Sequence, residues 1–206
     1  MQKLAPLLGR TLVLAAHEDD ESLGCGALLQ RMASPVVVFA TDGAPTDPKW
    51  WQPYGSREAL ANVRKSEGRK AMQIAGVKNI EFLADHDPAF ADQELFRHLP
   101  RASELLLKIA RRNRSQAMLT HAYEGGHPDH DTCSLLGFFL GQQLRIPVWE
   151  MPYYNRAGSE EIVHQKFLYK TGEEMILVPS AEELERKQAM LAAHQSQQHV
   201  IPQFDP

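Results

Sequence analysis

Two clusters of histidine and carboxylate side chains are the features of this sequence best suited to chemistry. The first, His17-Glu18-Asp19-Asp20-Glu21, is a run of five ionisable residues directly after an apolar segment. The second lies much further along the chain and contains His121, Glu124, His127, Asp129, His130 and Asp131. Imidazoles and carboxylates together are the ligands of catalytic zinc sites, where three protein groups leave one position open for water. The carboxylates of the first cluster would repel a phosphate, so we expect a cation there.

The hydrophobic pattern predicts the elements that carry these clusters. Short apolar runs predict strands at residues 11–16, 36–41, 79–83, 116–120 and 147–151. Helical periodicity predicts helices at residues 22–32, 56–75, 92–113 and 128–144, with Pro100 splitting or kinking the third. Alternating strands and helices are typical of a parallel sheet covered by helices, in which ligands bind at the carboxyl ends of the strands. Each cluster follows a predicted strand, so we expect both at the same edge of the sheet.

The second cluster is expected to begin a helix. Pro128 suits the first position of a helix, which places His127 near the N-cap and His130 in the first turn. The spacing of His130 from the apolar residues that follow turns its ring toward the interior. His17, Asp20 and His130 then supply two imidazoles and one carboxylate, the donor set of an open catalytic zinc site.

Two residues beside these ligands are candidates for proton transfer. Asp19 cannot point the same way as Asp20 at a strand-to-helix turn, so it is free to act as general base on the water beside the metal. His127, three residues before His130, is expected to stabilise a developing oxyanion or to protonate a leaving amine.

Composition excludes several other classes of protein. The 206 residues carry 22 Lys and Arg against 26 Asp and Glu, a net charge of -4, so nothing points to a nucleic-acid partner. The length and the lack of a linker or repeat predict a single domain over residues 1–206. No apolar run is long enough for a signal peptide or a membrane span. The two cysteines, Cys25 and Cys133, are expected to be buried free thiols of a cytoplasmic protein.

The carboxyl-terminal part has a different pattern. Residues 165–169 and 175–178 are expected to pair as a hairpin across a turn at 170–174. A capping box of Ser180 and Glu183 predicts the start of a last helix, which we expect to run to about residue 198. Long loops at 42–55, 84–91 and 153–163 are candidates for functional segments.

The motifs resemble those of the zinc-dependent N-acetylglucosaminyl deacetylases of the PIG-L/LmbE type. The resemblance rests on His17 to Glu21 after an apolar strand and on Gly126-His127-Pro128-Asp129-His130 downstream. It continues with Thr41-Asp42-Gly43, Arg64, Glu67, Ala71, Lys187 and His194-Gln195-Ser196-Gln197. It spans nearly the whole chain, with one departure: Glu18 stands where the usual motif, Ala-His-Pro-Asp-Asp-Glu, has proline. Because no ligand position is lost, we interpret this departure as tuning of the site.

The resemblance implies a Rossmann-like α/β sandwich and hydrolysis of an N-acetyl group from a small-molecule amino sugar. The site residues that it implies are the zinc ligands His17, Asp20 and His130, the base Asp19, His127 as a partner of the tetrahedral intermediate, and Asp129 as support for His127 or the metal ligands. These roles agree with those expected from the spacing.

Three further residues are candidates for substrate binding. Glu67 falls on the inward stripe of its helix with Arg64 one turn away, and inward charges are rare unless paired or functional. We expect Arg64 to hydrogen-bond a sugar hydroxyl, although an ion pair between Arg64 and Glu67 explains the pattern equally well. Trp51, with Trp50 and Tyr54 in the same loop, is expected to stack on a sugar ring or cover the site, and a structural flap is the alternative.

Two other functions compete with deacetylation. A phosphoesterase would use the same carboxylates with magnesium or manganese, but it prefers oxygen ligands and a cationic clamp, for which only Arg64 is near. A non-catalytic sugar-binding relative is the third hypothesis, which the presence of both Asp19 and His127 disfavours. The metal is open as well, since this donor set accepts iron or cobalt in place of zinc. The sugar conjugate and the oligomeric state cannot be inferred from the residues.

Overall fold

The structure is a computed structural model that describes residues 5–156 and 162–203. At its centre is a five-stranded sheet in which every neighbouring pair is parallel, in the order β3-β2-β1-β4-β5. The strands are β1 (Thr11–Ala15), β2 (Val36–Phe39), β3 (Asn79–Phe82), β4 (Ala117–His121) and β5 (Val148–Met151). All the expected strands are present, and β1 and β4, which precede the two polar clusters, are neighbours.

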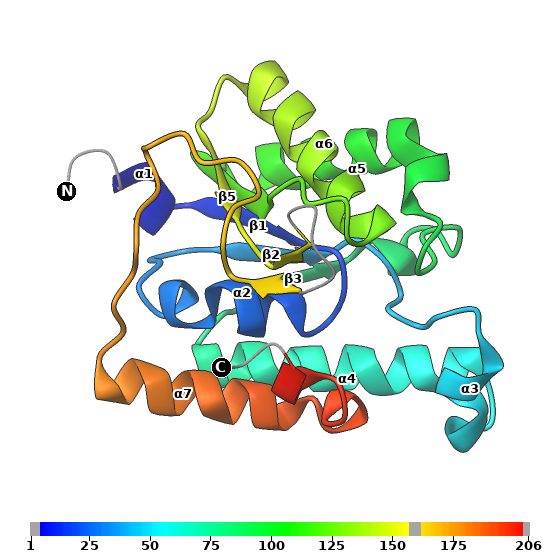
Figure 1. The fold of residues 1–206 in the computed structure, drawn as a ribbon. Helices are drawn as coiled ribbons and strands as arrows, with labels where there is room; N and C mark the ends of the chain where they lie inside the picture. The colour runs from blue at the N-terminus through cyan, green and yellow to red at the C-terminus, as the bar shows by residue number, and fades with distance from the viewer. Residues whose placement is uncertain (1–4, 157–161, 204–206) are drawn as a thin grey trace.

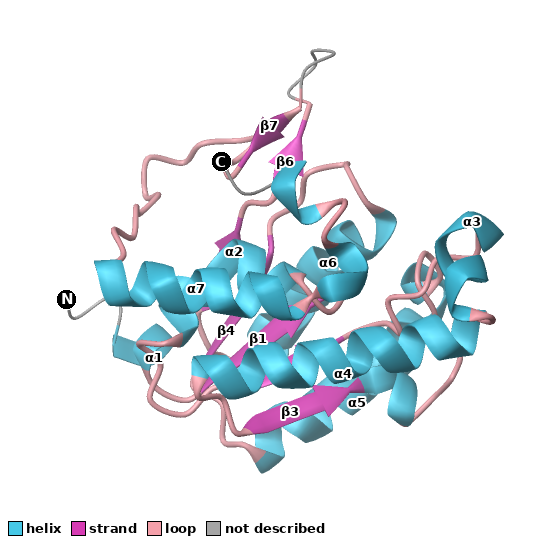
Figure 2. Cartoon of the chain, turned by 90° about the horizontal axis from the view of Figure 1, so that it is seen from below, coloured by secondary structure: helices cyan, strands magenta, loops and turns pink. Residues whose placement is uncertain are grey.

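Helices cover both faces of the sheet. The α-helices in the described part of the chain are α1 (Ala5–Leu8), α2 (Asp20–Leu29), α3 (Pro48–Trp51), α4 (Arg57–Ala75), α5 (Leu99–Arg112), α6 (Pro128–Leu144) and α7 (Ala181–Ala193). Helices α2, α4 and α7 lie on one face, and α5 and α6 lie on the other (Figure 1). Helices α4 and α7 run side by side (Figure 2). This arrangement is the Rossmann-like sandwich that the motifs imply.

The central strand β1 packs against both layers. Val13 and Ala15 belong to an apolar cluster with residues of α2, α4 and α7, whereas Leu12 and Leu14 belong to a second cluster with residues of α5 and α6. Every residue of β1 is buried. A continuous apolar run, rather than an alternating one, is typical of such a strand because both of its faces are covered.

Capping side chains set the ends of several helices. Ser56 accepts a hydrogen bond from the Ala59 amide at the start of α4, and Gly76 follows its end in the left-handed region at φ 78°. Ser180 and Glu183 form the predicted capping box of α7. These boundaries agree with the sequence because each depends on residues within one turn.

The predicted hairpin at residues 165–169 and 175–178 is wrong. The structure describes all of residues 165–178 and has no strand there. Within the loop expected at 153–163, β6 (Tyr154–Asn155) pairs antiparallel with β7 (Val163–His164), and residues 157–161 between them lie outside the described part. Ile176 and Val178 are 92% and 76% exposed, so the apolar pattern of their segment has no layer to pack against. A strand-like pattern forms a strand only where a partner backbone and a covering layer exist.

The helix expected over residues 92–113 begins later than predicted. It starts with a 3₁₀ turn at Leu95–His98 and continues as α5, with Pro100 in the first turn. The amides of Gln93 and Leu95 donate instead to the carboxylate of Asp129, which holds this stretch outside the helix. Tertiary hydrogen bonds therefore outweigh local helix propensity here.

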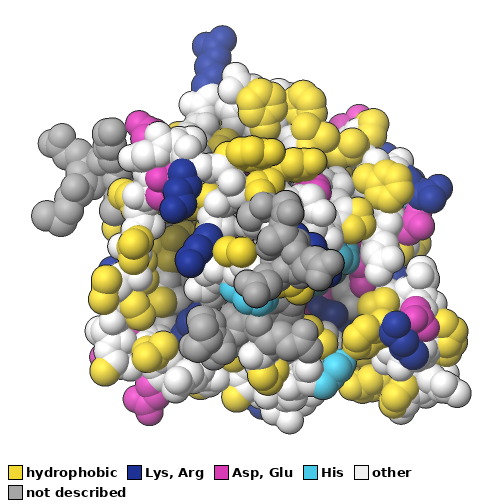
Figure 3. Space-filling model, viewed as in Figure 1, with side chains coloured by type: hydrophobic (Ala, Val, Ile, Leu, Met, Phe, Trp, Pro, Cys, Tyr) yellow, Lys and Arg dark blue, Asp and Glu magenta, His cyan; other side chains and the backbone are white. Residues whose placement is uncertain are grey.

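Apolar side chains also reach the surface. Hydrophobic side chains gather over α6 (Figure 3), where Leu135, Phe138 and Phe139 are 42%, 57% and 48% exposed. In the part of the chain that the structure describes, no helix combines the length and the apolar character needed to cross a membrane.

We expect both cysteines to be protected from thiol reagents in the folded protein. Cys25 and Cys133 are free and buried, as predicted, and burial raises the pKa of each thiol. A chromogenic disulfide reagent at about pH 8 should label neither thiol in the native protein and both in guanidinium chloride, because the thiolate is the reactive form. Rapid labelling of the native protein would contradict this placement.

Candidate active site

The two polar clusters meet in the middle of the sheet. The order β3-β2-β1-β4-β5 changes direction between β1 and β4, which is where open parallel sheets bind ligands. Residues 17–20 follow β1 and residues 127–130 follow β4. The predicted shared edge is therefore present.

The turn between β1 and α2 sends its two aspartates in different directions. The His17 amide donates to Asp20 Oδ2 at 2.8 Å, which folds this carboxylate back over the turn. Asp20 faces His130, whereas Asp19 Oδ2 lies 3.2 Å from Nη2 of Arg64. The divergence expected for Asp19 and Asp20 is thus observed.

The three residues expected to bind metal lie together. Asp20 Oδ2 is 3.4 Å from His17 Nδ1, and Asp20 Oδ1 is 3.5 Å from His130 Nε2. The ring centroids of His17 and His130 are 5.3 Å apart. All three residues are buried, with exposures of 7%, 2% and 3% for His17, Asp20 and His130. Asp20 therefore contacts both imidazoles, one with each carboxylate oxygen, although His130 comes from a distant segment of the sequence.

Other donor atoms surround the same place. His127 keeps 22% of its side chain exposed, and its ring centroid is 4.7 Å from that of His17. His121 is fully buried and stacks on His130 with 4.2 Å between centroids. Ligand atoms lie within 4.8 Å of one another in three overlapping groups: His17, His127 and His130; His17, Asp92, His127 and Asp129; and Asp20, His121 and His130. The place therefore offers more donors than the three expected ligands.

The donor chemistry fits a divalent metal ion. Burial lowers the pKa of His130 to about 3, with His121 acting in the same direction, and the neutral imidazole is the form that binds metal. Burial alone would raise the pKa of Asp20, but His130 and His121 outweigh it and hold this pKa well below its usual value. Asp92 is 3% exposed, and its Oδ1 has no hydrogen-bond partner among the described residues. A neutral imidazole at His130 beside the ionised Asp20, with further carboxylate oxygens close by, suits a cation rather than an anion.

Asp19 has the surroundings of a general base. It is 8% exposed, and burial raises its pKa to about 6 although the charge of Arg64 opposes this shift. A base with a pKa in this range exchanges protons efficiently near neutral pH. Arg64 engages one oxygen of the carboxylate and so gives it a defined orientation.

His127 is oriented by the start of α6. Its Nδ1 accepts a hydrogen bond of 3.2 Å from the Asp129 amide, so the neutral ring carries its proton on Nε2. Nε2 lies 3.8 Å from Oδ1 of Asp92. An imidazole with its free N–H at the rim of the cluster is suited to donate to a developing oxyanion.

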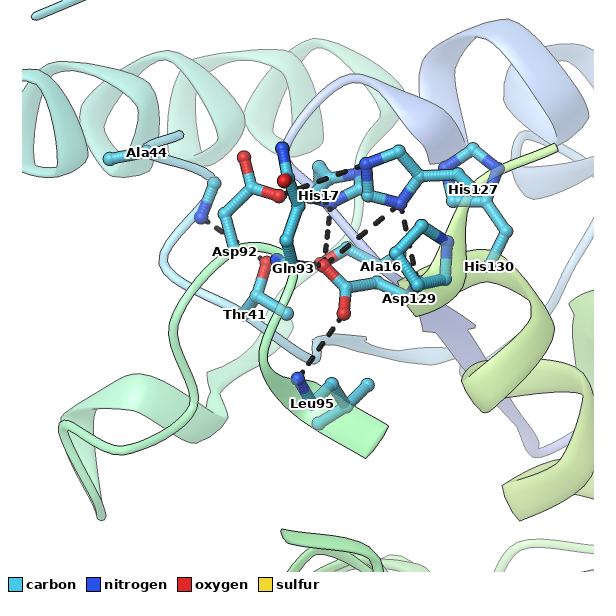
Figure 4. Close-up of polar contacts among 12 residues, drawn as sticks. Ala16, His17, Thr41, Ala44, Asp92, Gln93, Leu95, His127, Asp129 and His130 are labelled. Carbon is cyan, nitrogen blue, oxygen red and sulfur yellow. Dashed lines mark hydrogen bonds and ion pairs between the residues drawn. The ribbon is translucent and has the colours of Figure 1, made fainter. Parts of the chain in front are cut away.

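Asp129 joins several parts of the site and is fully buried. Its Oδ2 accepts from the Gln93 amide at 2.6 Å and its Oδ1 from the Leu95 amide at 3.2 Å. Oδ2 also lies 3.3 Å from Nε2 of His17 (Figure 4). A carboxylate on the second ring nitrogen is a common support for a metal-binding histidine, and this contact suits the supporting role predicted for Asp129.

No role was predicted from the sequence for two residues of this cluster, Asp92 and His121. Asp92 Oδ1 lies 3.4 Å from His17 Nε2, although the periodicity places Asp92 at the start of a helix (Figure 4). His121 Nε2 lies 3.2 Å from Oδ2 of Asp20. His121 ends β4 at the carboxyl edge of the sheet, which is a signal that could have identified it, whereas no local pattern points to Asp92.

Arg64 lies beside the acidic turn. It is 6% exposed, and its guanidinium contacts Asp19 and Glu18. The alternative of an ion pair with Glu67 is not observed among the contacts of the described residues. A hydrogen bond from Arg64 to a sugar hydroxyl remains a prediction.

Glu67 and Trp51 make contacts away from the cluster. The Glu67 carboxylate accepts from the Ser196 amide at 2.9 Å and from its hydroxyl at 2.7 Å. These bonds hold the 3₁₀ turn Gln195–Gln197, and α7 ends at Ala193 rather than near residue 198 as predicted. Trp51 Nε1 donates to the Thr46 carbonyl in its own loop at 3.3 Å. Substrate contacts for Glu67 and Trp51 remain predictions.

Comparisons with known proteins agree with this site. Residues 12–138 match the PIG-L family, described as GlcNAc-PI de-N-acetylase. A probable N-acetyl-alpha-D-glucosaminyl L-malate deacetylase 2 of Bacillus cereus is 24% identical over 199 residues, which cover 92% of this chain and 84% of that protein.

Solved structures share the fold. A deacetylase in the teicoplanin biosynthesis pathway matches with a TM-score of 0.73 and 16% identity, covering 93% of this chain and 86% of that one. The N,N'-diacetylchitobiose deacetylase of Pyrococcus horikoshii matches with a TM-score of 0.64 and 20% identity, covering 91% of this chain and 70% of that one. Because the family match includes both β1 with its acidic turn and the histidines that begin α6, the chain belongs to the PIG-L family of de-N-acetylases.

Proposed function

We propose that the chain is a metal-dependent hydrolase that removes the N-acetyl group of an N-acetylglucosamine-type amino sugar or its conjugate, releasing acetate and a free amine. The observation that carries this proposal is the meeting of His17, Asp20 and His130 between β1 and β4, with Asp19 and His127 beside them. Membership in a de-N-acetylase family supports the same reaction.

His17, Asp20 and His130 are the residues that we propose as metal ligands, with zinc as the metal. When bound, zinc supplies a Lewis acid for the amide carbonyl and makes water a stronger nucleophile at neutral pH. Two imidazoles and one carboxylate would hold the ion with the donor set that is typical of catalytic zinc sites.

Asp19 and His127 are the residues that we propose for proton transfer. Asp19 accepts a proton from the attacking water, whose oxygen bonds to the acetyl carbon. The Nε2 proton of His127 faces the charge that develops on the acetyl oxygen. As the C–N bond breaks, Asp19 passes the proton that it took from water to the leaving nitrogen, so acetate and a free amine are formed. Asp129 keeps His17 and the Gln93–Leu95 backbone in place during these steps.

The N-acetylated glucosamine unit is the part of the substrate that we propose is recognised. The similar proteins are named for different molecules, namely a glucosaminyl malate, teicoplanin and diacetylchitobiose. A panel that varies the group attached to N-acetylglucosamine therefore tests the proposal more broadly than one compound.

The test is acetate release from that panel by the purified protein. We expect release from at least one N-acetylated sugar, its loss after dialysis against a chelator, and its return with added zinc. Aryl phosphates with magnesium or manganese are assayed alongside, because the same carboxylates would serve a phosphoesterase. Phosphate release without acetate release would overturn the proposal, and binding of N-acetyl sugars without turnover would favour a non-catalytic relative.

The native metal and the cellular location are finer parts of this proposal. Zinc is proposed over iron and cobalt, and metal analysis of protein purified without added metal decides between them. The cytoplasmic setting expected from the sequence remains a prediction that cell fractionation tests.

A further inference from the structure

Glu18 is a buried carboxylate inside the β1–α2 turn. It is 1% exposed and stands where the related motif has proline. Its Oε2 has no hydrogen-bond partner among the residues that the structure describes. Burying a carboxylate is costly unless a charge compensates it, so its surroundings need an explanation.

Two glycines make the space that the Glu18 side chain fills. A Cβ on Gly68, inside α4, would lie 3.1 Å from Cβ and 3.2 Å from Cγ of Glu18. A Cβ on Gly43 would lie 2.1 Å from Glu18 Oε2 and 2.9 Å from Arg64 Nε. Gly43 has a left-handed backbone conformation, with φ 61°, which itself favours glycine. Gly68 has no positive φ, so its backbone conformation does not call for glycine. A glycine inside a helix is destabilising relative to alanine, so Gly68 is explained by the side chain that packs on it.

Arg64 connects Glu18 to Asp19. Its Nε lies 3.6 Å from Oε2 of Glu18 and, like that oxygen, has no hydrogen-bond partner within the described residues. Its Nη2 lies 3.2 Å from Oδ2 of Asp19 and donates to the Glu18 carbonyl at 3.3 Å. The planar guanidinium therefore has one edge on each of the two carboxylates.

We infer that Glu18 is a positioning residue that acts through Arg64 on Asp19. A planar guanidinium held at two points has a defined orientation, whereas one held at a single carboxylate can rotate. Glu18 fixes the Nε side of Arg64, so Nη2 stays on Asp19 and sets the direction in which the Asp19 carboxylate faces the site. This inference rests on the proposed function, in which Asp19 is the general base. The usual motif has proline at this position, and proline has no carboxylate that could contact Arg64, so the arrangement depends on Glu18.

The test compares kcat and KM for acetate release in Glu18→Ala, Glu18→Gln, Arg64→Ala and the Glu18→Ala/Arg64→Ala double variant. We expect Glu18→Ala to lower kcat by about 10- to 100-fold with KM and bound metal unchanged, because a misplaced group costs this much in rate. Glu18→Gln should retain most of the wild-type kcat, since its amide oxygen can occupy the place of Oε2 beside Nε of Arg64. The double variant should be no slower than Arg64→Ala alone, because Glu18 has no effect without Arg64.

Glu183→Ala is the matched control. It removes a carboxylate from the ion pair with Arg31, which joins the segment after α2 to α7 away from the acidic turn, and should leave kcat unchanged. Wild-type kcat in Glu18→Ala, or losses that multiply in the double variant, would overturn the inference while the proposed function stands.

A second measurement does not depend on activity. The urea midpoints of the metal-free proteins should show the same non-additive pattern for Glu18→Ala and Arg64→Ala, because the two side chains form one unit. If the shifts in urea midpoint of the two single variants simply add in the double variant, Glu18 and Arg64 do not form one unit and the inference is overturned. If the wild-type protein releases no acetate, the proposed function fails, and this measurement alone decides whether Glu18 and Arg64 are coupled.

Discussion

Asp19→Asn is expected to lower kcat by about 10²- to 10⁴-fold while the protein keeps its metal. Asparagine has nearly the shape of aspartate and can still accept a hydrogen bond from Arg64, which lies 3.2 Å from Asp19 Oδ2. It cannot accept a proton from water, so the step assigned to the general base is lost. The measurement is kcat for acetate release together with metal content on the same preparation.

The matched control for this prediction is Asp47→Asn, which changes a carboxylate that pairs with Lys49 at the start of α3. That variant should have wild-type kcat. If Asp19→Asn lost its metal as well as its activity, Asp19 would be reassigned as a ligand. If it kept full activity, another group would have to be the base.

Metal should be lost from His17→Ala and His130→Ala but retained by His127→Ala and His121→Phe. This pattern separates the proposed ligand set from the other groups of donors at the site. Mutating a residue that only hydrogen-bonds to a metal ligand weakens metal binding by about 10- to 100-fold, so removing a ligand itself should weaken metal binding at least this much. The measurement is metal content after dialysis against a weak chelator, followed by acetate release.

The two retained variants differ in activity. His127→Ala should be slow because the Nε2 donor is missing, whereas His121→Phe keeps a ring stacked on His130 and should remain active. Loss of metal from His121→Phe with retention in His17→Ala would instead support the group of Asp20, His121 and His130. Folding of each variant is checked by its thermal unfolding.

The sequence alone determined the elements of the sheet and the identity of the clustered residues. The run from Thr11 to Ala15 is apolar throughout because both faces of β1 are covered, and this property is visible in the residues themselves. Pro128 and the Ser180 capping box mark helix starts through contacts within one turn. Because parallel strands bring their carboxyl ends to one edge, the meeting of His17 with His130 also followed from the pattern.

Only the tertiary structure decided which partners these residues have. Asp92 reaches His17 because the Asp129 carboxylate holds the amides of Gln93 and Leu95, a contact that no local pattern encodes. Arg64 pairs with Glu18 and Asp19 rather than with Glu67, and the segment at 175–178 remains unpaired although its residues favour a strand. Short-range signals set where helices and strands begin, but the pairing of side chains and strands depends on which distant surfaces the packed sheet brings within reach.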